Sequence, residues 1–313
     1  MTPAGTTPMR AGHLPVADLI DLYMADYAGR DTSRHQRLGW WRTQLGAVPL
    51  QEVTDDHIHA ALEALKSQPA RYYAGRDAYG HPIYKAKRRQ ISPATLNRYS
   101  ASIGAVFTWG IKRRIAPKGW VHPCRAVERN PETSGRTRFL RDDERERLLA
   151  ACRLSRWPRL YLLVLMALTT GARRGELLGM RWQDVNLAQA VVHVPTTKNG
   201  DPKVLPLTPP VLEELKHIQG LPAELIFKSP RRPRQPFGFD PQWKQAMRQA
   251  GIRGFRFHDL RHSCASMLAA SGATLLEIGD LLGHRQISMT RRYSHLAASH
   301  RSALVCRVMG ELK

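Results

Sequence analysis

The sequence contains little that would indicate a secreted or membrane protein. Its 313 residues include only 4 cysteines, without the paired spacing of a metal site or a disulfide framework: Cys124, Cys152, Cys264 and Cys306. No apolar run reaches the ~18 residues of a membrane span, and the longest candidate is LYLLVLMALTTGA. Because no signal peptide pattern precedes the cysteines, we expect reduced thiols in a soluble, cytoplasmic protein.

Acidic residues are also scarce. The chain has 26 Asp and Glu against 48 Lys and Arg, which gives a formal net charge of +22. The excess is uneven: residues 1–70 hold 6 basic and 8 acidic residues, whereas residues 71–129 hold 13 basic and 2 acidic ones. A concentrated positive field favours a polyanionic partner such as nucleic acid, although a merely solubilising surface charge would give the same total.

The stretch of residues 253–295 contains the side chains best suited to chemistry. His258 and Arg261 lie three residues apart among apolar residues at helical spacing, so both are expected on one face of a helix. Further on, Tyr293 follows directly after Arg291 and Arg292. A tyrosine with its ordinary pKa near ~10 attacks at neutral pH only if a base takes its proton or cations stabilise the phenolate. Guanidinium groups bind phosphate oxygens bidentately, so this stretch indicates attack on a phosphodiester.

The same stretch has clear helix start and stop signals. A helix is predicted from Thr274, as N-cap, to Gly283, where it ends, which leaves His284 on a loop. Ser288 is a plausible N-cap for a further short helix that carries Tyr293.

Three motifs here, HDLRHS (residues 258–263), LGH (282–284) and RRYSH (291–295), resemble the C-terminal signature of the tyrosine recombinases, the group that contains the phage integrases. The nine-residue interval from His284 to Tyr293 also matches. Upstream, TTGARRGELLGMRWQDV (169–185) resembles the family's first-arginine box, and TTKNGDPKVLPL (196–207) resembles its lysine hairpin. Because five matches follow in order over about half of the chain, the resemblance is specific.

The resemblance implies six catalytic residues and one supporting carboxylate: Arg173, Lys198, His258, Arg261, His284 and Tyr293, with Glu176 in support. Tyr293 would attack a scissile phosphate and form a 3′-phosphotyrosyl intermediate. Arg173 and Arg261 would bind the nonbridging oxygens, and His284 would stabilise the transition state. The resemblance implies that neither a metal nor a nucleotide cofactor is needed.

Two of these roles stay open in the sequence. His258 would act either as a base or as a hydrogen-bond partner. Lys198, directly before the turn-forming Asn199-Gly200, would protonate the leaving 5′ oxygen, but Lys203 takes its place if the register of the hairpin differs. His262 and His295 are interpreted as structural.

The resemblance also implies the fold: mainly α with a small antiparallel β-sheet, in which a helical core-binding domain precedes a mixed α/β catalytic domain. Helical periodicity in the first part, with Asp55 and Ser92 as N-caps, agrees with this. Residues 71–89 interrupt the pattern as a hairpin or a mobile loop. The expected divisions are a disordered tail (1–12), the core-binding domain (13–117), a linker (118–138) and the catalytic domain with a C-terminal tail helix (139–313).

Basic residues in the hairpin, the helix ends and the loops are candidate DNA contacts, with a solvated surface as the alternative. They are Lys85, Lys87, Arg88, Arg89, Arg98, Lys112, Arg113, Arg114, Arg174, Arg231, Arg232, Arg291 and Arg292.

Three other functions fit these residues less well. His258 and His262 have the spacing of a zinc-protease helix, but Asp259 stands where the general base belongs and Arg261 would lie beside the metal. An inactive DNA-binding protein of the same fold is disfavoured because all six positions are occupied. A type IB topoisomerase relative is disfavoured by the lysine hairpin and the short tail.

The expected partner is double-stranded DNA at attachment sites, with host DNA-bending or directionality proteins as possible helpers and a nucleoid location while on DNA. An apolar stripe on the predicted terminal helix, residues 297–312, points to a homo-tetramer assembled by tail exchange or to a tail folded onto its own domain. The stripe consists of Leu304, Val305, Val308, Met309 and Leu312.

Overall fold

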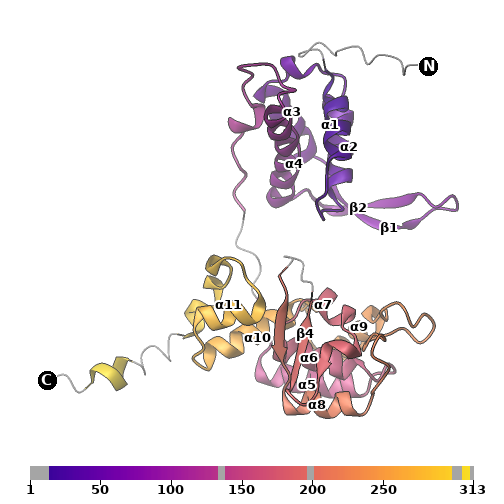
Figure 1. Cartoon of the computed structure of the whole chain (residues 1–313), viewed down its shortest axis with the longest axis vertical. Coiled ribbons are helices and arrows are strands. Elements are labelled where there is room, and N and C mark those ends of the chain that lie inside the picture. Colours follow the sequence, from indigo (N-terminus) through magenta and orange to yellow (C-terminus); the bar gives the residue numbers. More distant parts are fainter. Residues whose placement is uncertain (1–13, 133–137, 196–200, 298–304, 311–313) are drawn as a thin grey trace, which may run out of the picture. The chain divides into compact units, whose positions relative to one another are not determined.

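The computed structural model of the chain describes residues 14–132, 138–195, 201–297 and 305–310. It forms two compact units, Met1–Ser134 and Gly135–Lys313 (Figure 1). The tail expected over residues 1–12 lies outside the described residues. Among the described residues, none of the helices combines the length and the apolar character needed to cross a membrane.

The first unit is helical. Its helices are α1 (Val16–Ala25), α2 (Arg34–Leu45), α3 (Asp55–Lys66) and α4 (Pro93–Lys112), with two short 3-10 turns, η1 (Leu50–Glu52) and η2 (Pro123–Arg125). They pack around one apolar core in which Trp41, Ile103 and Phe107 are fully buried.

Helix starts in this unit follow local capping chemistry. The Ser92 hydroxyl accepts a hydrogen bond from the Thr95 amide at 3.3 Å, which confirms Ser92 as the N-cap of α4. The prediction that Asp55 caps α3 is wrong by one residue. Thr54 has the extended backbone of a cap, and Asp55 is the first helical residue, where its negative charge favours the helix N-terminus.

Strands β1 (Pro69–Arg76) and β2 (Pro82–Gln90) form an antiparallel hairpin, which projects from the helices (Figure 1). Its turn is held by Asp77, whose carboxylate accepts hydrogen bonds from the amides of Tyr79 (2.9 Å) and His81 (2.8 Å). The structure therefore selects the hairpin over the mobile loop for residues 71–89.

Part of the predicted linker packs onto the first unit. The rings of Trp120 and His122 lie 5.4 and 5.8 Å from the ring of Phe107, both edge to face. The His122 imidazole also lies 3.0 Å from the carbonyl oxygen of Gly104 in α4. The sequence predicts a linker here because the segment is rich in proline and lacks periodicity. In the structure, aromatic contacts hold Trp120 and His122 in place.

The second unit combines helices with a small sheet. Its elements are α5 (Asp142–Arg153), α6 (Leu160–Thr170), α7 (Arg174–Gly179), η3 (Trp182–Asp184), β3 (Val185–Asn186), β4 (Val191–Val194), β5 (Lys203–Pro206), α8 (Pro209–Lys216), α9 (Asp240–Gln249), α10 (Asp259–Ala270), α11 (Leu275–Leu282), η4 (Ile287–Met289) and η5 (Arg291–Ala297). The strands are antiparallel in the order β3-β4-β5. The expected mainly α fold with a small antiparallel sheet is confirmed.

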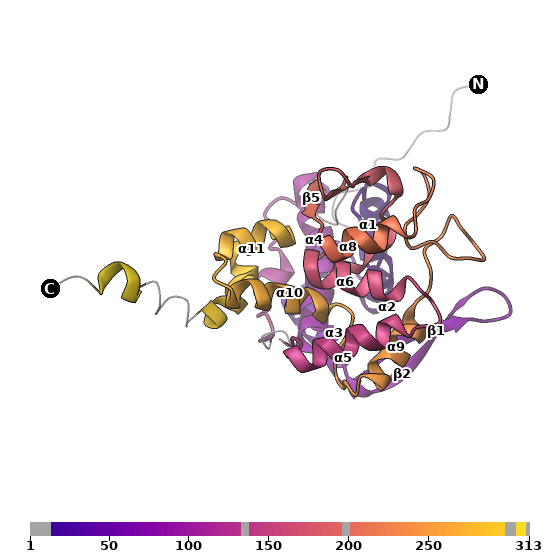
Figure 2. The ribbon, with the colours of Figure 1, turned by 90° about the horizontal axis from the view of Figure 1, so that it is seen from below.

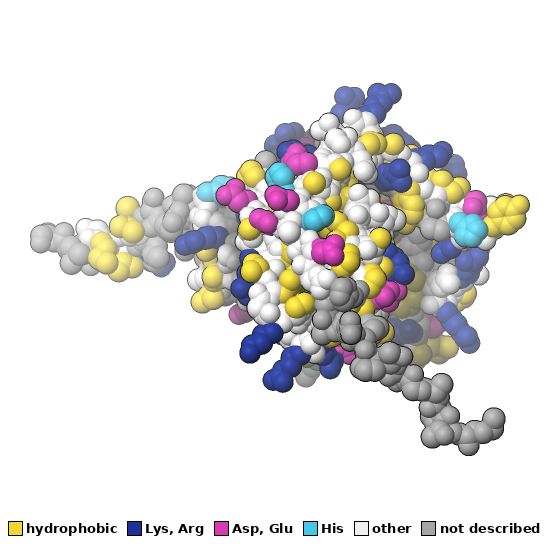
Figure 3. All heavy atoms as spheres, turned by 90° about the horizontal axis from the view of Figure 1, so that it is seen from above, with side chains coloured by type: hydrophobic (Ala, Val, Ile, Leu, Met, Phe, Trp, Pro, Cys, Tyr) yellow, Lys and Arg dark blue, Asp and Glu magenta, His cyan; other side chains and the backbone are white. Residues whose placement is uncertain are grey.

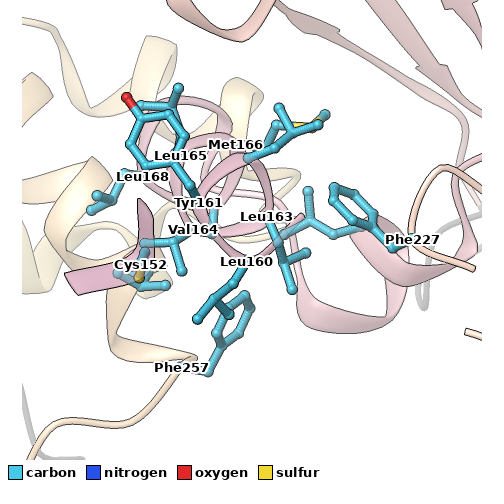
Figure 4. Packing of buried hydrophobic residues seen from close by; sticks show 14 of the residues in the cluster. Cys152, Leu160, Tyr161, Leu163, Val164, Leu165, Met166, Leu168, Phe227 and Phe257 are labelled. Atoms are coloured by element: carbon cyan, nitrogen blue, oxygen red, sulfur yellow. The ribbon is translucent and has the colours of Figure 1, made fainter. Parts of the chain in front are cut away.

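Helix α6 is apolar on every side and forms the centre of this unit. Cys152, Phe227 and Phe257 from three other segments lie around it (Figure 4). A helix that is apolar all round must be covered on all sides, and α6 is contacted by α5, α7, α8 and α10. The packing on all sides therefore holds the C-terminal end of α6 in a defined position within the unit.

Helices α10 and α11 lie side by side, with η5 against them (Figure 2). Between them is a small apolar cluster of buried residues: Ala265, Ala269, Ile278, Leu282 and Tyr293. Beyond η5, residues 305–309 are helical, and the side chains of Val305, Val308 and Met309 are exposed.

Candidate active site

The first part of the site lies where α6 ends and α7 begins. Gly171 adopts a left-handed backbone with φ 60°, which ends α6 and turns the chain toward Arg173, the N-cap of α7. The Glu176 carboxylate then holds Arg173 at two points, accepting from its amide and from Nη1, both at 2.9 Å. This double contact fixes the Arg173 guanidinium at the start of the helix.

Lys203, the first residue of β5, binds the same carboxylate. Its Nζ lies 2.7 Å from Glu176 Oε2, and the two side chains are 9% and 5% exposed. Burial favours a raised pKa for Glu176, but its hydrogen bonds with Lys203 and Arg173 lower the pKa below its ordinary value. Burial also lowers the pKa of the Lys203 ammonium. Lys203 thus stands among the site residues as a buried lysine, while Lys198 lies outside the described residues.

Arg261 joins the ends of two helices. From α10, its Nη1 donates to the carbonyl oxygen of Gly171 at 2.7 Å and its Nη2 donates to that of Leu282 at 2.6 Å. Burial, followed by the charge of Arg173, lowers the pKa of Arg261 to about 10, so it stays charged at neutral pH. A buried cation next to Arg173 forms an anion site that a phosphate would satisfy.

His284 follows α11, as predicted. Thr274 caps that helix, its hydroxyl accepting from the Glu277 amide, and Gly283 ends it with a left-handed φ of 66°. The His284 Nδ1 lies 2.8 Å from the Thr290 hydroxyl, which orients the ring. Burial, with the charges of Arg261 and Arg173, lowers the pKa of His284 to about 4, so the ring is neutral at pH 7.

Tyr293 lies in η5, and its side chain is 1% exposed. The prediction that Ser288 caps a short helix carrying this tyrosine is wrong. Ser288 lies inside the 3-10 turn η4, and Tyr293 is in a separate 3-10 helix. The segment lacks the apolar periodicity that packs an α-helix onto a core, so it folds as two tight turns with Tyr293 as its buried anchor.

The tyrosine hydroxyl is hydrogen-bonded to His262. The distance from Tyr293 Oη to His262 Nδ1 is 2.6 Å. Burial raises the pKa of Tyr293, and burial together with the charge of His258 lowers the pKa of His262. The interpretation of His262 as structural did not predict this bond to Tyr293. The available signal was its position four residues after His258, which places both on one side of α10.

His258 lies at the N-terminus of α10 and is exposed. Its ring centroid is 5.4 Å from that of His262, nearly perpendicular to it. Burial of part of its ring and the charge of Arg261 lower its pKa. The expected sharing of a face by His258 and Arg261 holds only in part, since Arg261 is buried and His258 reaches solvent.

Two candidate DNA contacts are paired within the protein. Arg174 makes a bidentate ion pair with Asp240, at 2.8 and 2.7 Å, and its guanidinium stacks over Phe239. Arg113 donates to the Asp26 carboxylate at 2.6 Å. The DNA contacts expected of Arg174 and Arg113 stay predictions, and these arginines would gain less from a phosphate than unpaired ones because each already has a carboxylate.

The other candidates remain available. The cations of the hairpin and those at positions 231, 232, 291 and 292 are mostly exposed, and none forms an ion pair among the described residues. Figure 3, which looks down from above, shows Lys and Arg side chains mainly around the outline of the view. Within the described part of the chain, no three His, Cys, Asp or Glu side chains form a group that could hold a metal ion.

Comparisons with known proteins agree with this geometry. Residues 138–300 match the model of the phage integrase family. The integrase of Salmonella phage P22 is 26% identical over 287 residues, which cover 84% of this chain and 71% of that protein. A shufflon-specific DNA recombinase of Escherichia coli is 33% identical over 181 residues, covering 56% and 45% of the two chains.

Solved structures show the same fold. The Tn1549 transposon integrase in complex with a circular intermediate DNA aligns with a TM-score of 0.69 at 16% identity, over 93% of this chain and 99% of that one. A lambda integrase dimer bound to a COC′ core site aligns with a TM-score of 0.65 at 20% identity, over 90% and 95%. This chain belongs to the phage integrase family and is a site-specific tyrosine recombinase, an enzyme that cleaves and rejoins DNA.

Proposed function

We propose that this recombinase acts as the integrase of a prophage or mobile element, cutting double-stranded DNA at attachment sites through a 3′-phosphotyrosyl bond to Tyr293. One observation carries the assignment. A buried tyrosine, hydrogen-bonded to His262, lies close enough to the buried cation Arg261 for that charge to offset part of the rise that burial causes in its pKa, and the same cation acts on the neutral His284. This arrangement supports Tyr293 as a nucleophile beside groups that are suited to bind and stabilise a phosphate.

Arg173 and Arg261 bind the nonbridging oxygens. Each keeps N–H donors beyond those that contact Glu176 and the two carbonyl oxygens, and these donors can bind the phosphate. Since the protein already fixes both groups, they stabilise the pentacoordinate transition state without reorganising. This preorganised charge takes the place that a metal ion has in other phosphoryl-transfer enzymes.

The histidines have complementary roles. His284 uses Nδ1 on Thr290, so its other ring nitrogen is left to donate to a phosphate oxygen. His258, exposed at the start of α10, is assigned as a hydrogen-bond partner of the bound phosphate.

Lys198 is the proposed general acid, which protonates the leaving 5′ oxygen. Its support is its place in the sequence, directly before the turn-forming pair Asn199-Gly200 and between the antiparallel strands β4 and β5. Lys203 is the alternative, because it lies beside Glu176 with a lowered pKa. Its ion pair favours a different role, in which Lys203 keeps Glu176 in position to hold Arg173.

DNA contacts outside the site are assigned to the exposed cations. Five lie on the projecting hairpin and the adjoining helix: Lys85, Lys87, Arg88, Arg89 and Arg98. At the level of the assembly, we assign a homo-tetramer on DNA, with exchange of the C-terminal segment whose Val305, Val308 and Met309 are exposed. Host DNA-bending and directionality proteins would assist it, and it would act in the bacterial cytoplasm at the nucleoid.

The experiment begins by sequencing the flanks of the gene, where direct repeats or a tRNA gene would mark the attachment site. A nicked suicide substrate of that site should trap a covalent adduct with the wild-type protein in excess EDTA. Tyr293→Phe should bind the same DNA and form no adduct. An adduct retained by Tyr293→Phe would contradict the assignment, and a wild type that binds without reacting would support the inactive DNA-binding alternative.

A further inference from the structure

The hydroxyl of Tyr293 has a single hydrogen-bond partner among the described residues, Nδ1 of His262 at 2.6 Å. His262 lies in α10 one residue after Arg261, and Tyr293 comes from η5, so two elements are needed to form the pair. The tyrosine is 1% exposed and the histidine is partly buried. Bulk water is therefore poorly placed to take the proton from this hydroxyl.

The surroundings favour a neutral pair at rest. Two guanidinium groups act on it, Arg261 of α10 and Arg292 of η5, and the nearby Asp259 only partly offsets them. With the ring neutral and its proton on Nε2, Nδ1 is an acceptor and the phenol is the donor. The groups around the pair are His258, Asp259, Arg261 and Cys264 of α10, Arg292 of η5 and His284 after α11.

We propose that His262 is the general base of the cleavage step, which accepts the phenolic proton as Tyr293 attacks the phosphate. This inference rests on the proposed role of Tyr293 as nucleophile. The O–H bond of Tyr293 breaks and an N–H bond forms at Nδ1, while the phenolic oxygen bonds to phosphorus. The bond from phosphorus to the 5′ oxygen breaks, and that oxygen takes its proton from the general-acid lysine.

His258 is less suited to this role. Among the described residues it makes no hydrogen bond with Tyr293, and its ring lies against that of His262 instead. Its exposed position suits contact with the DNA phosphate. The imidazolium formed at His262 lies close to the phosphorane, which is negatively charged, so the proton transfer also places a positive charge where the transition state needs it.

The test is a pH profile of adduct formation in a single turnover. His262→Asn keeps a polar group near the Nδ1 position but cannot accept a proton. At pH 7 it should slow cleavage by about 100-fold or more, the usual contribution of a general base. The wild-type rate should level off above the pKa of His262, whereas the rate of the variant should keep rising with pH. His295→Gln, at an exposed position in η5, is the matched control and should follow the wild type.

A second measurement separates proton transfer from a structural role. In wild type and in His262→Asn, Tyr293 is replaced by 3,5-difluorotyrosine, whose more acidic phenol depends less on a base. The rate loss caused by His262→Asn should then shrink by about tenfold or more. An equal loss with both tyrosines would overturn the proposal, as would a variant that keeps wild-type rates.

Folding and the proposed function are checked in the same series. Single-site DNA binding and thermal unfolding are measured for every variant. If His262→Asn does not fold, the plateau in the wild-type profile is compared with an NMR titration of His262, and a mismatch between them would count against the base. If the wild type itself forms no adduct, the proposed function fails. If the wild type forms the adduct but its pH profile coincides with that of His262→Asn, only the proposed role of His262 fails.

Discussion

The guanidinium of Arg261 donates a hydrogen bond of 2.6 Å to the carbonyl oxygen of Leu282, the last residue of α11. Together with its bond to the Gly171 carbonyl, this contact ties the ends of α6 and α11 to α10. Arg173 approaches the next carbonyl, that of Gly283, at 3.5 Å. The arginines that would bind the phosphate thus also hold together the loop that positions His284.

Arg261→Lys should therefore destabilise the protein without DNA, because lysine cannot span both carbonyls and leaves one of them buried without a donor. We expect a loss of about 1–3 kcal/mol in the free energy of unfolding. Urea unfolding followed by circular dichroism measures it. The matched control is Arg292→Lys, at an exposed position in η5, which should change stability by about 0.5 kcal/mol or less. Equal stability of both variants would show that the carbonyl contacts contribute nothing.

His284 should make the protein less stable in mild acid. Its folded pKa is about 4, below the ordinary value of 6.5, so the unfolded chain binds a proton at pH values where the folded ring does not. Its contribution is fully present above about pH 6.5 and is lost as the pH falls toward 4. His284→Gln should lose less stability than wild type between pH 7 and pH 5 in urea titrations. The exposed His193→Gln should keep the wild-type dependence, and identical slopes in all three would refute this.

The roles of Lys198 and Lys203 can be distinguished by how strongly cleavage by each variant depends on the leaving group. Lys198→Ala should slow cleavage of a normal phosphodiester far more than that of a 5′-bridging phosphorothiolate, whose sulfur leaves without a proton. Lys203→Ala should slow both substrates to a similar extent. The substitution would loosen the positions of Glu176 and Arg173 but would remove no proton donor. The reverse pattern would make Lys203 the acid.

The cations of the β1–β2 hairpin should contribute to DNA affinity through counterion release. Replacing Lys85, Arg88 and Arg89 by alanine should weaken binding and reduce the slope of log K against log salt by about 0.9 for each phosphate that the protein no longer neutralises. Arg113→Ala is the control, because Asp26 already pairs with that guanidinium. Fluorescence anisotropy at several salt concentrations measures both. An unchanged slope in the triple variant would indicate that these cations are solvated and do not contact DNA phosphates.

Sequence alone predicted the parts of the structure that depend on local signals. Thr274 and Gly283 delimit α11 as expected, because capping and a left-handed glycine are chemistry within a few residues. The matching of motifs also brought Arg173, Arg261 and His284 together, although they are far apart in the chain.

Contacts between distant segments escaped prediction. Arg174 finds Asp240, 66 residues away, and nothing near either residue indicates the pair. The bond between His262 and Tyr293 depends on the path of two 3-10 turns. Their sequence has no apolar periodicity from which that path could be predicted. Likewise, the placement of Lys203 against Glu176 follows from where β5 begins in the sheet.

Identifying the residue that becomes attached to DNA is the decisive test of Tyr293 as the nucleophile. The wild-type adduct on the suicide substrate is digested with trypsin and nuclease and analysed by tandem mass spectrometry. We predict one modified peptide, with a nucleotide phosphate on Tyr293. A nucleotide found on any other of the 9 tyrosines, or on a serine or histidine, would contradict this assignment.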